Sequence, residues 1–297
     1  MFLPPRRSKT AQAGLAGLLL SPLLAGPLAA RAQAPAKYGV GLAKAAPPVE
    51  EIVKKAIERA KRDGDQKFDT RYTYTQHSTV EELDSGERVK KHEERLLLVF
   101  PIEGESYARL IQKDGKPLSE KDARLERERE RKFRQRQAER KRRKEQGQRD
   151  DDDIEITEGL ASKYKFTLIG SEPVNGRPAY VLSFEPRSSD LPIKRRLDRL
   201  LNKVAGRVWI DEQDFEISHA DLHLAEDVSA WGGVLASLRK FLLRVDQTKV
   251  DETVWLPRYV DAYFDGRILV KTFHMKLQQQ NSDFRRIVSG PPGSSQQ

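Results

Sequence analysis

Apolar and polar residues alternate along much of the chain with a period of two, which is typical of half-buried β-strands. In the segment 68–83, for example, Phe68, Tyr72 and Tyr74 are the large apolar positions. Short turns separate such segments, among them Asn175-Gly176, a pair that favours a tight hairpin. The pattern predicts an antiparallel meander with strands in 68–83, 88–101, 105–116, 163–170, 176–186, 206–224, 241–250, 253–264 and 267–280.

Two segments follow the helical period instead, and each predicts an amphipathic helix that needs a surface to cover. The first lies between Pro48 and Gly64, and its apolar stripe consists of Val49, Ile52, Val53, Ala56 and Ala60. The second ends at Gly206, and its stripe consists of Ile193, Leu197, Leu200, Leu201 and Val204. The run 234–245 fits both periods, so a helix stays open there as the alternative to a strand from about residue 240.

A long charged segment, 119–148, interrupts the meander and has almost no apolar stripe. A capping-box-like Ser119-x-x-Asp122 begins it, and the pairs Glu128 with Lys132 and Glu130 with Arg134 support a helix. Residues 121–149 hold 14 Lys or Arg against 6 Asp or Glu, which accounts for nearly all of the net charge of +9. At 1.5 Å per residue, the segment predicts a rod of roughly 45 Å that stands in solvent and is dispensable for folding.

Together these elements make about ten strands and two covering helices. One curled antiparallel sheet with helices over its concave face is the simplest arrangement, so the predicted fold class is α+β, mainly antiparallel β. The strand 254–264 is apolar on both faces, because Val260, Ala262 and Phe264 alternate with Trp255, Tyr259 and Tyr263. Two interpretations of it stay open: helix cover on one face with a tyrosine surface on the other, or an apolar pocket between helix and sheet.

The N-terminus has the features of a secretory signal peptide over residues 1–32. Arg6, Arg7 and Lys9 precede a short apolar run, and cleavage is expected near Ala32 and Gln33. Residues 33–47 predict a flexible linker, 48–286 a single domain with an insertion at 119–150, and 287–297 a disordered tail. The chain has no cysteine, which excludes disulfides, thiol catalysis and lipid attachment. We therefore expect an exported, unlipidated periplasmic protein.

One motif suggests a metal site, the H-x-D-x-H triplet of His219, Asp221 and His223, whose side chains share one side of a strand. Because the alternating Ala220 and Leu222 require the core side, we expect the triplet to face solvent and to bind no metal. The parity of the preceding residues also predicts a β-bulge near Ser218. No nucleotide-binding, hydrolase or metalloprotease motif is present, so we expect no enzyme activity and no cofactor. The charged segment has one aromatic residue and no nucleic-acid-reading motif, so nucleic acid is not expected as a partner.

Four segments in order resemble the LolA/LolB superfamily of outer-membrane lipoprotein-sorting proteins. They are "VNGRPAYVLSFEP", "AGRVWIDEQDFEISHADLHL", "TKVDETVWLPRYV" and "NSDFRR", and the resemblance covers roughly 48–286. The resemblance implies a half-open curled β-barrel of about 10–11 strands, closed by helices over a cavity that takes lipid acyl chains. It also implies that the strand from Gly206 to Asp211, with Trp209, re-enters the sheet after a plug helix.

The chain departs from this family in two respects. The best-known carriers are shorter and lack the charged segment, and the lipidated receptor member needs a cysteine that is absent here. The same fold also serves as a sensor domain for envelope stress. The resemblance therefore implies the fold but not the cargo.

The sequence supports two functional hypotheses. The first is a monomeric, non-enzymatic periplasmic carrier or chaperone that shields a lipid or lipoprotein acyl chain. The alternative is an envelope sensor or scaffold that binds an envelope protein or anionic membrane through the charged helix, without transport. A metal-dependent hydrolase that uses His219 and His223 is a third hypothesis, retained only so that it can be tested. The cavity candidates are Ile193, Leu197, Leu200, Leu201, Val204, Trp209 and Phe264. The membrane or partner candidates are Arg134, Arg136, Arg140, Lys141, Arg142, Arg143 and Lys144.

Export gives the first testable prediction. If residues 1–32 are a signal, N-terminal sequencing of the protein from its native cells should find a mature chain that begins at Gln33 or within a few residues of it. Recovery of the full-length chain from the cytoplasm would contradict the predicted location.

Overall fold

The computed structural model describes residues 46–146, 156–188, 190–194, 197–230 and 236–287. Its strands are β1 (Tyr72–Leu83), β2 (Val89–Ile102), β3 (Glu105–Lys113), β4 (Lys116–Pro117), β5 (Tyr164–Val174), β6 (Arg177–Pro186), β7 (Val204–Asp211), β8 (Ile217–Leu224), β9 (Val228–Ala230), β10 (Ala236–Lys249), β11 (Trp255–Ile268) and β12 (Lys271–Arg286). Its helices are α1 (Val49–Gln66), the 3₁₀ turn η1 (Phe68–Arg71), α2 (Glu120–Glu145), α3 (Glu158–Ala161) and α4 (Asp198–Leu201).

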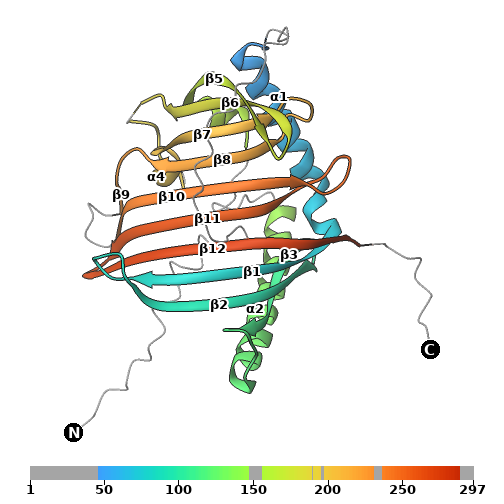
Figure 1. Cartoon of the computed structure of the whole chain (residues 1–297), viewed down its shortest axis with the longest axis vertical. Helices are drawn as coiled ribbons and strands as arrows, with labels where there is room; N and C mark the ends of the chain where they lie inside the picture. Colours follow the sequence, from blue (N-terminus) through green and yellow to red (C-terminus); the bar gives the residue numbers. More distant parts are fainter. Residues whose placement is uncertain (1–45, 147–155, 189, 195–196, 231–235, 288–297) are drawn as a thin grey trace.

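All 12 strands belong to one antiparallel sheet in the order β4-β3-β2-β1-β12-β11-β10-β8-β7-β6-β5, with β9 paired to β10. Figure 1 shows the strands stacked from β5 down to β2. The end strands β4 and β5 are not paired with each other, so the curled sheet stays open. The predicted fold class is confirmed, and the two strands beyond the expected ten, β4 and β9, have only 2 and 3 residues.

The predicted turn and bulge are both present. Asn175 and Gly176 have φ of 50° and 77°, the left-handed pair that a two-residue hairpin turn requires. In the β7–β8 hairpin, Trp209 pairs with His219 but Ile210 pairs with Ile217, so Ser218 is the extra residue. Its hydroxyl donates to the Trp209 carbonyl at 3.1 Å. The alternative helix in 234–245 is wrong from residue 236 onward, where β10 begins.

Strand register divides the side chains between two faces, because directly paired residues lie on the same side of a sheet. We call the inner face the one that carries Leu182, Val208, Ala220, Val245, Val260, Gln279 and Ser78, which follow one another through successive pairs. Helix α1 packs on this face, where Ile52 and Ala56 contact Leu182 and Ile210. The first predicted helix is therefore confirmed in both position and buried stripe.

The charged helix α2 lies on the opposite, outer face and is not free in solvent as predicted. Tyr107 of β3 is paired with Phe100, on the side away from the inner-face pair Val99 and Ala108. Its buried hydroxyl donates to Glu126 at 2.7 Å, and Arg109 donates to Glu130 at 2.8 Å. The docking residues of α2 are mainly charged, so a search for an apolar stripe does not detect them.

The local helix signals of α2 are confirmed. The backbone amide of Asp122 donates to the Ser119 hydroxyl at 3.1 Å, which caps the first turn. The predicted ion pairs are also present, since Lys132 lies 2.7 Å from Glu128 and Arg134 lies 2.9 Å from Glu130.

The second predicted helix is wrong in extent. Among the described residues of this segment, only Asp198–Leu201 is helical, Val204 already belongs to β7, and Ile193 is 55% exposed. Polar side chains fix the chain before α4, because Asn202 donates to the carbonyls of Leu191 and Pro192. A four-residue helix presents no continuous stripe, so it cannot act as a plug over the sheet.

Several predictions fall outside the described residues. They are the signal peptide in 1–32, the linker up to residue 45, the break at Gly232-Gly233, the helix stop formed by Gly147 and Asp150 to Asp153, and the tail from residue 288. Among the helices described, none combines the length and apolar character needed to cross a membrane.

The contact between α2 and β3 gives a stability prediction. Tyr107→Phe removes the hydroxyl that Glu126 accepts in a buried site, so the free energy of unfolding should fall by about 1 kcal/mol. Denaturant unfolding of the purified variant measures this change. Tyr263→Phe is the control, since no hydrogen bond involves that hydroxyl in the described residues, and equal losses in both variants would contradict the docking of α2.

Candidate functional site

An apolar cluster occupies the inner face beyond the area that α1 covers. Its buried members are Val260, Ala262 and Leu277, and the half-buried Val80, Leu243, Val245 and Phe264 pack against them. Within the described residues, every member of this inner-face cluster comes from β1, β10, β11 or β12. The sheet therefore carries a contiguous apolar cluster built by four neighbouring strands on one face.

A polar row adjoins the inner-face cluster. Gln76, Ser78, Gln279 and Asn281 are buried on the same face, as their pairing across β1 and β12 shows. Asn281 donates to the Pro257 carbonyl at 2.8 Å, whereas the buried Gln76 side-chain oxygen accepts from no donor among the described residues. A buried acceptor without a donor is costly, so this row offers a hydrogen-bonding position beside the apolar surface.

The C-terminal half of α1 is fixed by a buried ion network. The Arg59 side chain is 5% exposed and donates to Glu216 at 2.8 Å and to the Thr253 carbonyl. Asp63 lies 3.0 Å from the same guanidinium. Burial raises the pKa of Glu216 despite the lowering effect of Arg59. One arginine thus joins α1 to the β7–β8 turn and to the β10–β11 turn.

The H-x-D-x-H triplet lies on the outer face of the sheet, but only His223 is exposed there as predicted, whereas His219 and Asp221 are partly buried against each other. His219 contacts two carboxylates, with Nδ1 2.5 Å from Asp246 and Nε2 3.3 Å from Asp221, while His223 is exposed. Burial would lower the pKa of His219, but hydrogen bonds to Asp221 and Asp246 raise it to about 9. A histidine that donates from both ring nitrogens has no lone pair for a metal. In the described part of the chain, no three His, Asp or Glu side chains are grouped for metal binding.

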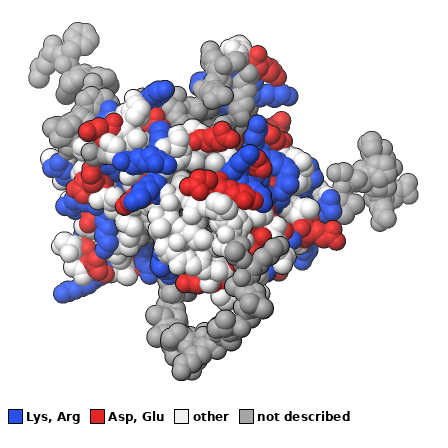
Figure 2. All heavy atoms as spheres, turned by 90° about the horizontal axis from the view of Figure 1, so that it is seen from above, with Lys and Arg blue, Asp and Glu red and all other residues white. Residues whose placement is uncertain are grey.

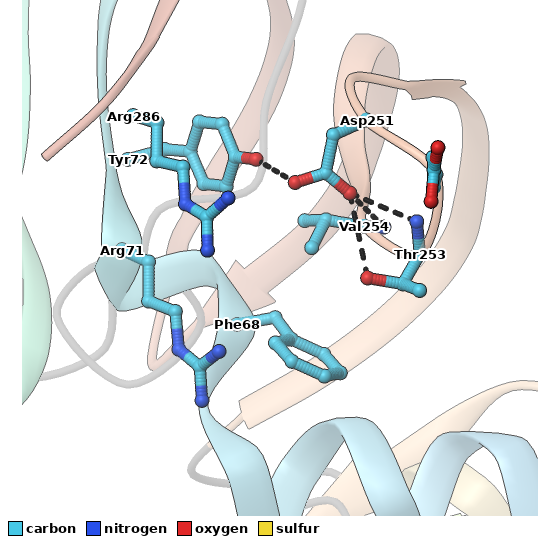
Figure 3. A pocket seen from close by; sticks show the side chains of 8 residues that line it. Phe68, Arg71, Tyr72, Asp251, Thr253, Val254 and Arg286 are labelled. Carbon is cyan, nitrogen blue, oxygen red and sulfur yellow. Dashed lines mark hydrogen bonds between the residues drawn. The ribbon is translucent and has the colours of Figure 1, made fainter. Parts of the chain in front are cut away.

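Two surface hollows complete the geometry. Figure 3 shows the first, of about 200 Å³, where Tyr72 donates to Asp251, the guanidinium of Arg286 lies beside Tyr72 and that of Arg71 beside Phe68. Burial and the bond to Asp251 raise the pKa of Tyr72 to about 12. Asp251 and Glu252 balance the two arginines, so this hollow does not favour a ligand of either charge. The second, of about 430 Å³, lies beside Arg207, Asp221 and His223.

The structure does not bring the predicted cavity residues together. Phe264 packs against the inner-face cluster, but Trp209 lies on the outer face, where its indole donates to Glu172 at 3.0 Å. Val204 is buried in β7 and Ile193 is exposed, while Leu197 caps the N-terminus of the short α4 and Leu200 and Leu201 lie within it. The expected pocket between Trp209, Phe264 and a plug helix is therefore corrected to a strand-built surface that includes only Phe264.

The predicted basic residues all lie on α2, in differing environments. Arg134 pairs with Glu130, and Arg140 is half-buried with a partner. Arg136, Lys141, Arg142 and Arg143 are exposed, and the Lys144 side chain is outside the described set. Figure 2 shows acidic and basic side chains interspersed around an uncharged area on one face of the molecule, without a basic surface of one sign in that view.

Sequence reasoning missed Arg59, Gln76, Gln279 and Asn281. Arg59 lies on the stripe of the first helix at the spacing of Ile52 and Ala56, and this position is the signal that could have found it. The glutamines and Asn281 lie in polar segments that look solvent-exposed in the sequence. Their common position on the inner face follows from the pairing of β1 with β12, which a single sequence does not reveal.

No protein-family model and no curated protein matches this chain. Several solved structures are similar to this chain. One is a domain from Vibrio parahaemolyticus that is named for outer membrane lipoprotein sorting, with 12% sequence identity, coverage of 81% of this chain and 95% of that chain, and a TM-score of 0.33. A LolA superfamily protein from Nitrosomonas europaea has 12% identity, coverage of 83% and 96%, and a TM-score of 0.27. The MucA/MucB complex of Pseudomonas aeruginosa has 12% identity, coverage of 80% and 99%, and a TM-score of 0.25. These matches include the superfamily that the sequence resembles, and at such TM-scores they assign no ligand or activity to this chain.

The His219 cluster gives a pH prediction. Because the folded pKa of about 9 lies above the ordinary 6.5, the contribution of this cluster to stability is complete below pH 6.5 and is lost as the pH rises through 9. The free energy of unfolding should fall by about 1–3 kcal/mol between pH 6 and pH 10. Denaturant unfolding should show this fall in the wild type and in the exposed-site control His77→Gln, but not in His219→Gln. An unchanged fall in His219→Gln would contradict the role of the cluster.

Proposed function

We propose that this protein binds the acyl chain of a lipid or lipoprotein against its inner face and shields it from water, as a non-enzymatic periplasmic carrier or chaperone. The observation that carries the proposal is the inner-face cluster, an apolar surface made by strands of one sheet. Val260, Ala262 and Leu277 are buried within this cluster, and a surface of this chemistry suits an apolar ligand, because transfer of an acyl chain from water to apolar surroundings is favourable. A single acyl chain has the length and chemistry to lie along it.

The energy of such binding is sufficient. Each buried methylene contributes about 0.8 kcal/mol, so a chain of about fourteen carbons gains on the order of 10 kcal/mol before the costs of ordering and association. The polar row supports the same ligand class, because a lipid or lipoprotein joins its acyl chain through an ester or amide. Gln76 and Gln279 lie at the side of the cluster where such a group would find hydrogen-bonding partners.

The second candidate function is an envelope sensor or scaffold that binds a partner through α2. The observation that favours it is the docking of α2 on β3, which holds the helix in a fixed position while Arg136, Arg142 and Arg143 stay exposed. A rigidly presented basic helix suits an acidic protein surface. In that case the inner-face cluster would be structural and no lipid would enter.

Titration with a fluorescent fatty acid or lipopeptide tests the first function. Phe264 and Tyr263 are adjacent on β11 but face opposite sides of the sheet, so they form a matched pair. Phe264→Glu should weaken binding at least tenfold by placing a charge in the apolar surface, whereas Tyr263→Glu should leave it unchanged.

Both variants must first show cooperative melting close to that of the wild type. Absence of binding by the wild type, together with a melting temperature that no lipid shifts, would reject the carrier and favour the scaffold. Equal loss in both variants would show that the inner face is not the binding surface.

A further inference from the structure

The turn between β11 and β12 differs from the other tight hairpin turns of the sheet. The turns at Glu103-Gly104, Asp114-Gly115 and Asn175-Gly176 each place a polar residue and a glycine at positive φ. At the β11–β12 turn, Ile268 pairs with Lys271, so the two turn residues are Leu269 and Val270. Leu269 has φ of 54°, a conformation that is unfavourable for leucine and ordinary for glycine or asparagine.

The same turn exposes its apolar side chains. Leu269 is 56% exposed and Val270 is 96% exposed, the highest value among the large apolar residues described. Neither strain at Leu269 nor exposure of Val270 stabilises the folded chain. Local strain together with apolar exposure is the combination that points to a function for the segment.

Basic residues flank this apolar turn. Arg267 and Lys271 are exposed on either side of it. The β1–β2 turn lies at the same end of the sheet in Figure 1, and there the exposed Val89 is flanked by Arg88 and Lys90. Of the two acidic residues in that turn, Asp84 is engaged by the backbone amides of Gly86 and Arg88, while Glu87 is exposed and offsets one of the basic charges. An apolar tip within a basic collar matches the interface of an anionic bilayer, where side chains enter the acyl region and cations contact phosphates.

The inner-face cluster leads directly to this tip. Along β11 and β12, the pairs Ala262 with Leu277, Phe264 with Met275 and Gly266 with Phe273 continue the inner face toward the turn. The Phe273 ring lies so close to Gly266 that a Cβ there would lie 2.6 Å from it. Ala262 at the inner end of this apolar row is 1% exposed, Gly266 is buried, and Ile268 at the outer end is 36% exposed. The row is continuous, and its outer end is the tip.

From these observations we propose that the tip, residues 267–271, docks on anionic phospholipid bilayers together with the β1–β2 turn at the same end of the sheet. Docking brings the outer end of the apolar row to the bilayer surface, so that an acyl chain can pass between the bilayer and the inner face without crossing water. The docking step stands on the geometry of the tip alone. Only the passage of an acyl chain rests on the proposed function.

Co-sedimentation with vesicles tests the docking, using the mature chain. Vesicles of phosphatidylglycerol and phosphatidylethanolamine should retain the protein, salt should weaken the retention, and phosphatidylcholine vesicles should bind at least tenfold less. The decisive variant is Leu269→Gly with Val270→Asn, which suits the turn geometry and removes both apolar side chains. It should keep or raise the melting temperature and lose at least tenfold in vesicle affinity.

Two controls separate the tip from other surfaces. Ile193→Asn removes an equally exposed apolar side chain elsewhere and should bind as the wild type does. Arg142→Glu with Arg143→Glu reverses charge on α2 and should also keep binding. Failure of the wild type to bind anionic vesicles, or full binding by the Leu269→Gly, Val270→Asn variant, would overturn the proposal. Loss of binding only in the α2 variant would assign the membrane surface to α2 and overturn it as well.

The acyl-binding titration distinguishes this inference from the proposed function. The tip variant should bind a soluble fluorescent fatty acid as the wild type does, while transferring it to vesicles at least tenfold more slowly. Vesicle binding without any fatty-acid binding would reject the carrier and leave the docking of the tip in place. Fatty-acid binding without vesicle docking would reject the docking of the tip and leave the carrier in place.

Discussion

Hydrogen-bond register within the single sheet is the constraint on which the rest of the molecule depends. Because side chains alternate along each strand, the pairing of neighbours places a whole set of apolar residues on one face. A shift of one residue between β11 and β12 would move Leu277 and Met275 to the outer face and break the row they form with Ala262 and Phe264. The bulge at Ser218 belongs to the same constraint, because the extra residue restores the inward direction of Ile217 after the turn.

The sequence predicted the features that depend on local periodicity. Strand alternation, the Asn175-Gly176 turn, the first helical stripe and the cap at Ser119 are all decided by residues a few positions apart. What it did not predict depends on distant partners. The apolar spacing of Leu197, Leu200 and Leu201 suits a helix, but Asn202 binds the carbonyls of Leu191 and Pro192 and fixes an irregular chain before it. Side-chain hydrogen bonds to backbone carbonyls beyond the helical spacing override an adequate helical pattern there.

The position of the charged helix could not be predicted from its charge. The excess of arginine in 119–148 is compatible both with a helix free in solvent and with a helix docked on the sheet. What decides between the two is the pair of contacts made by Tyr107 and Arg109 of β3. For Trp209, the sequence predicted a ligand-binding role that the structure does not support. A large aromatic residue suggested a cavity, yet its indole is held by Glu172 on the outer face, so the candidate surface had to be found through Phe264 and its paired neighbours instead.

The position of α1 limits how a ligand can reach the inner face. Release of this helix would separate the buried Arg59 from Glu216 and Asp63, and breaking a buried ion pair costs about 3–5 kcal/mol. The Ile52 and Ala56 contacts would be lost with it. The inner-face cluster lies on β10, β11, β12 and β1, whereas the helix is fixed on β6 and β7 and at the turns that precede β8 and β11. A chain that enters along β11 and β12 therefore meets the apolar surface without displacing α1. Entry from the β11–β12 end is the route with the smaller energetic cost.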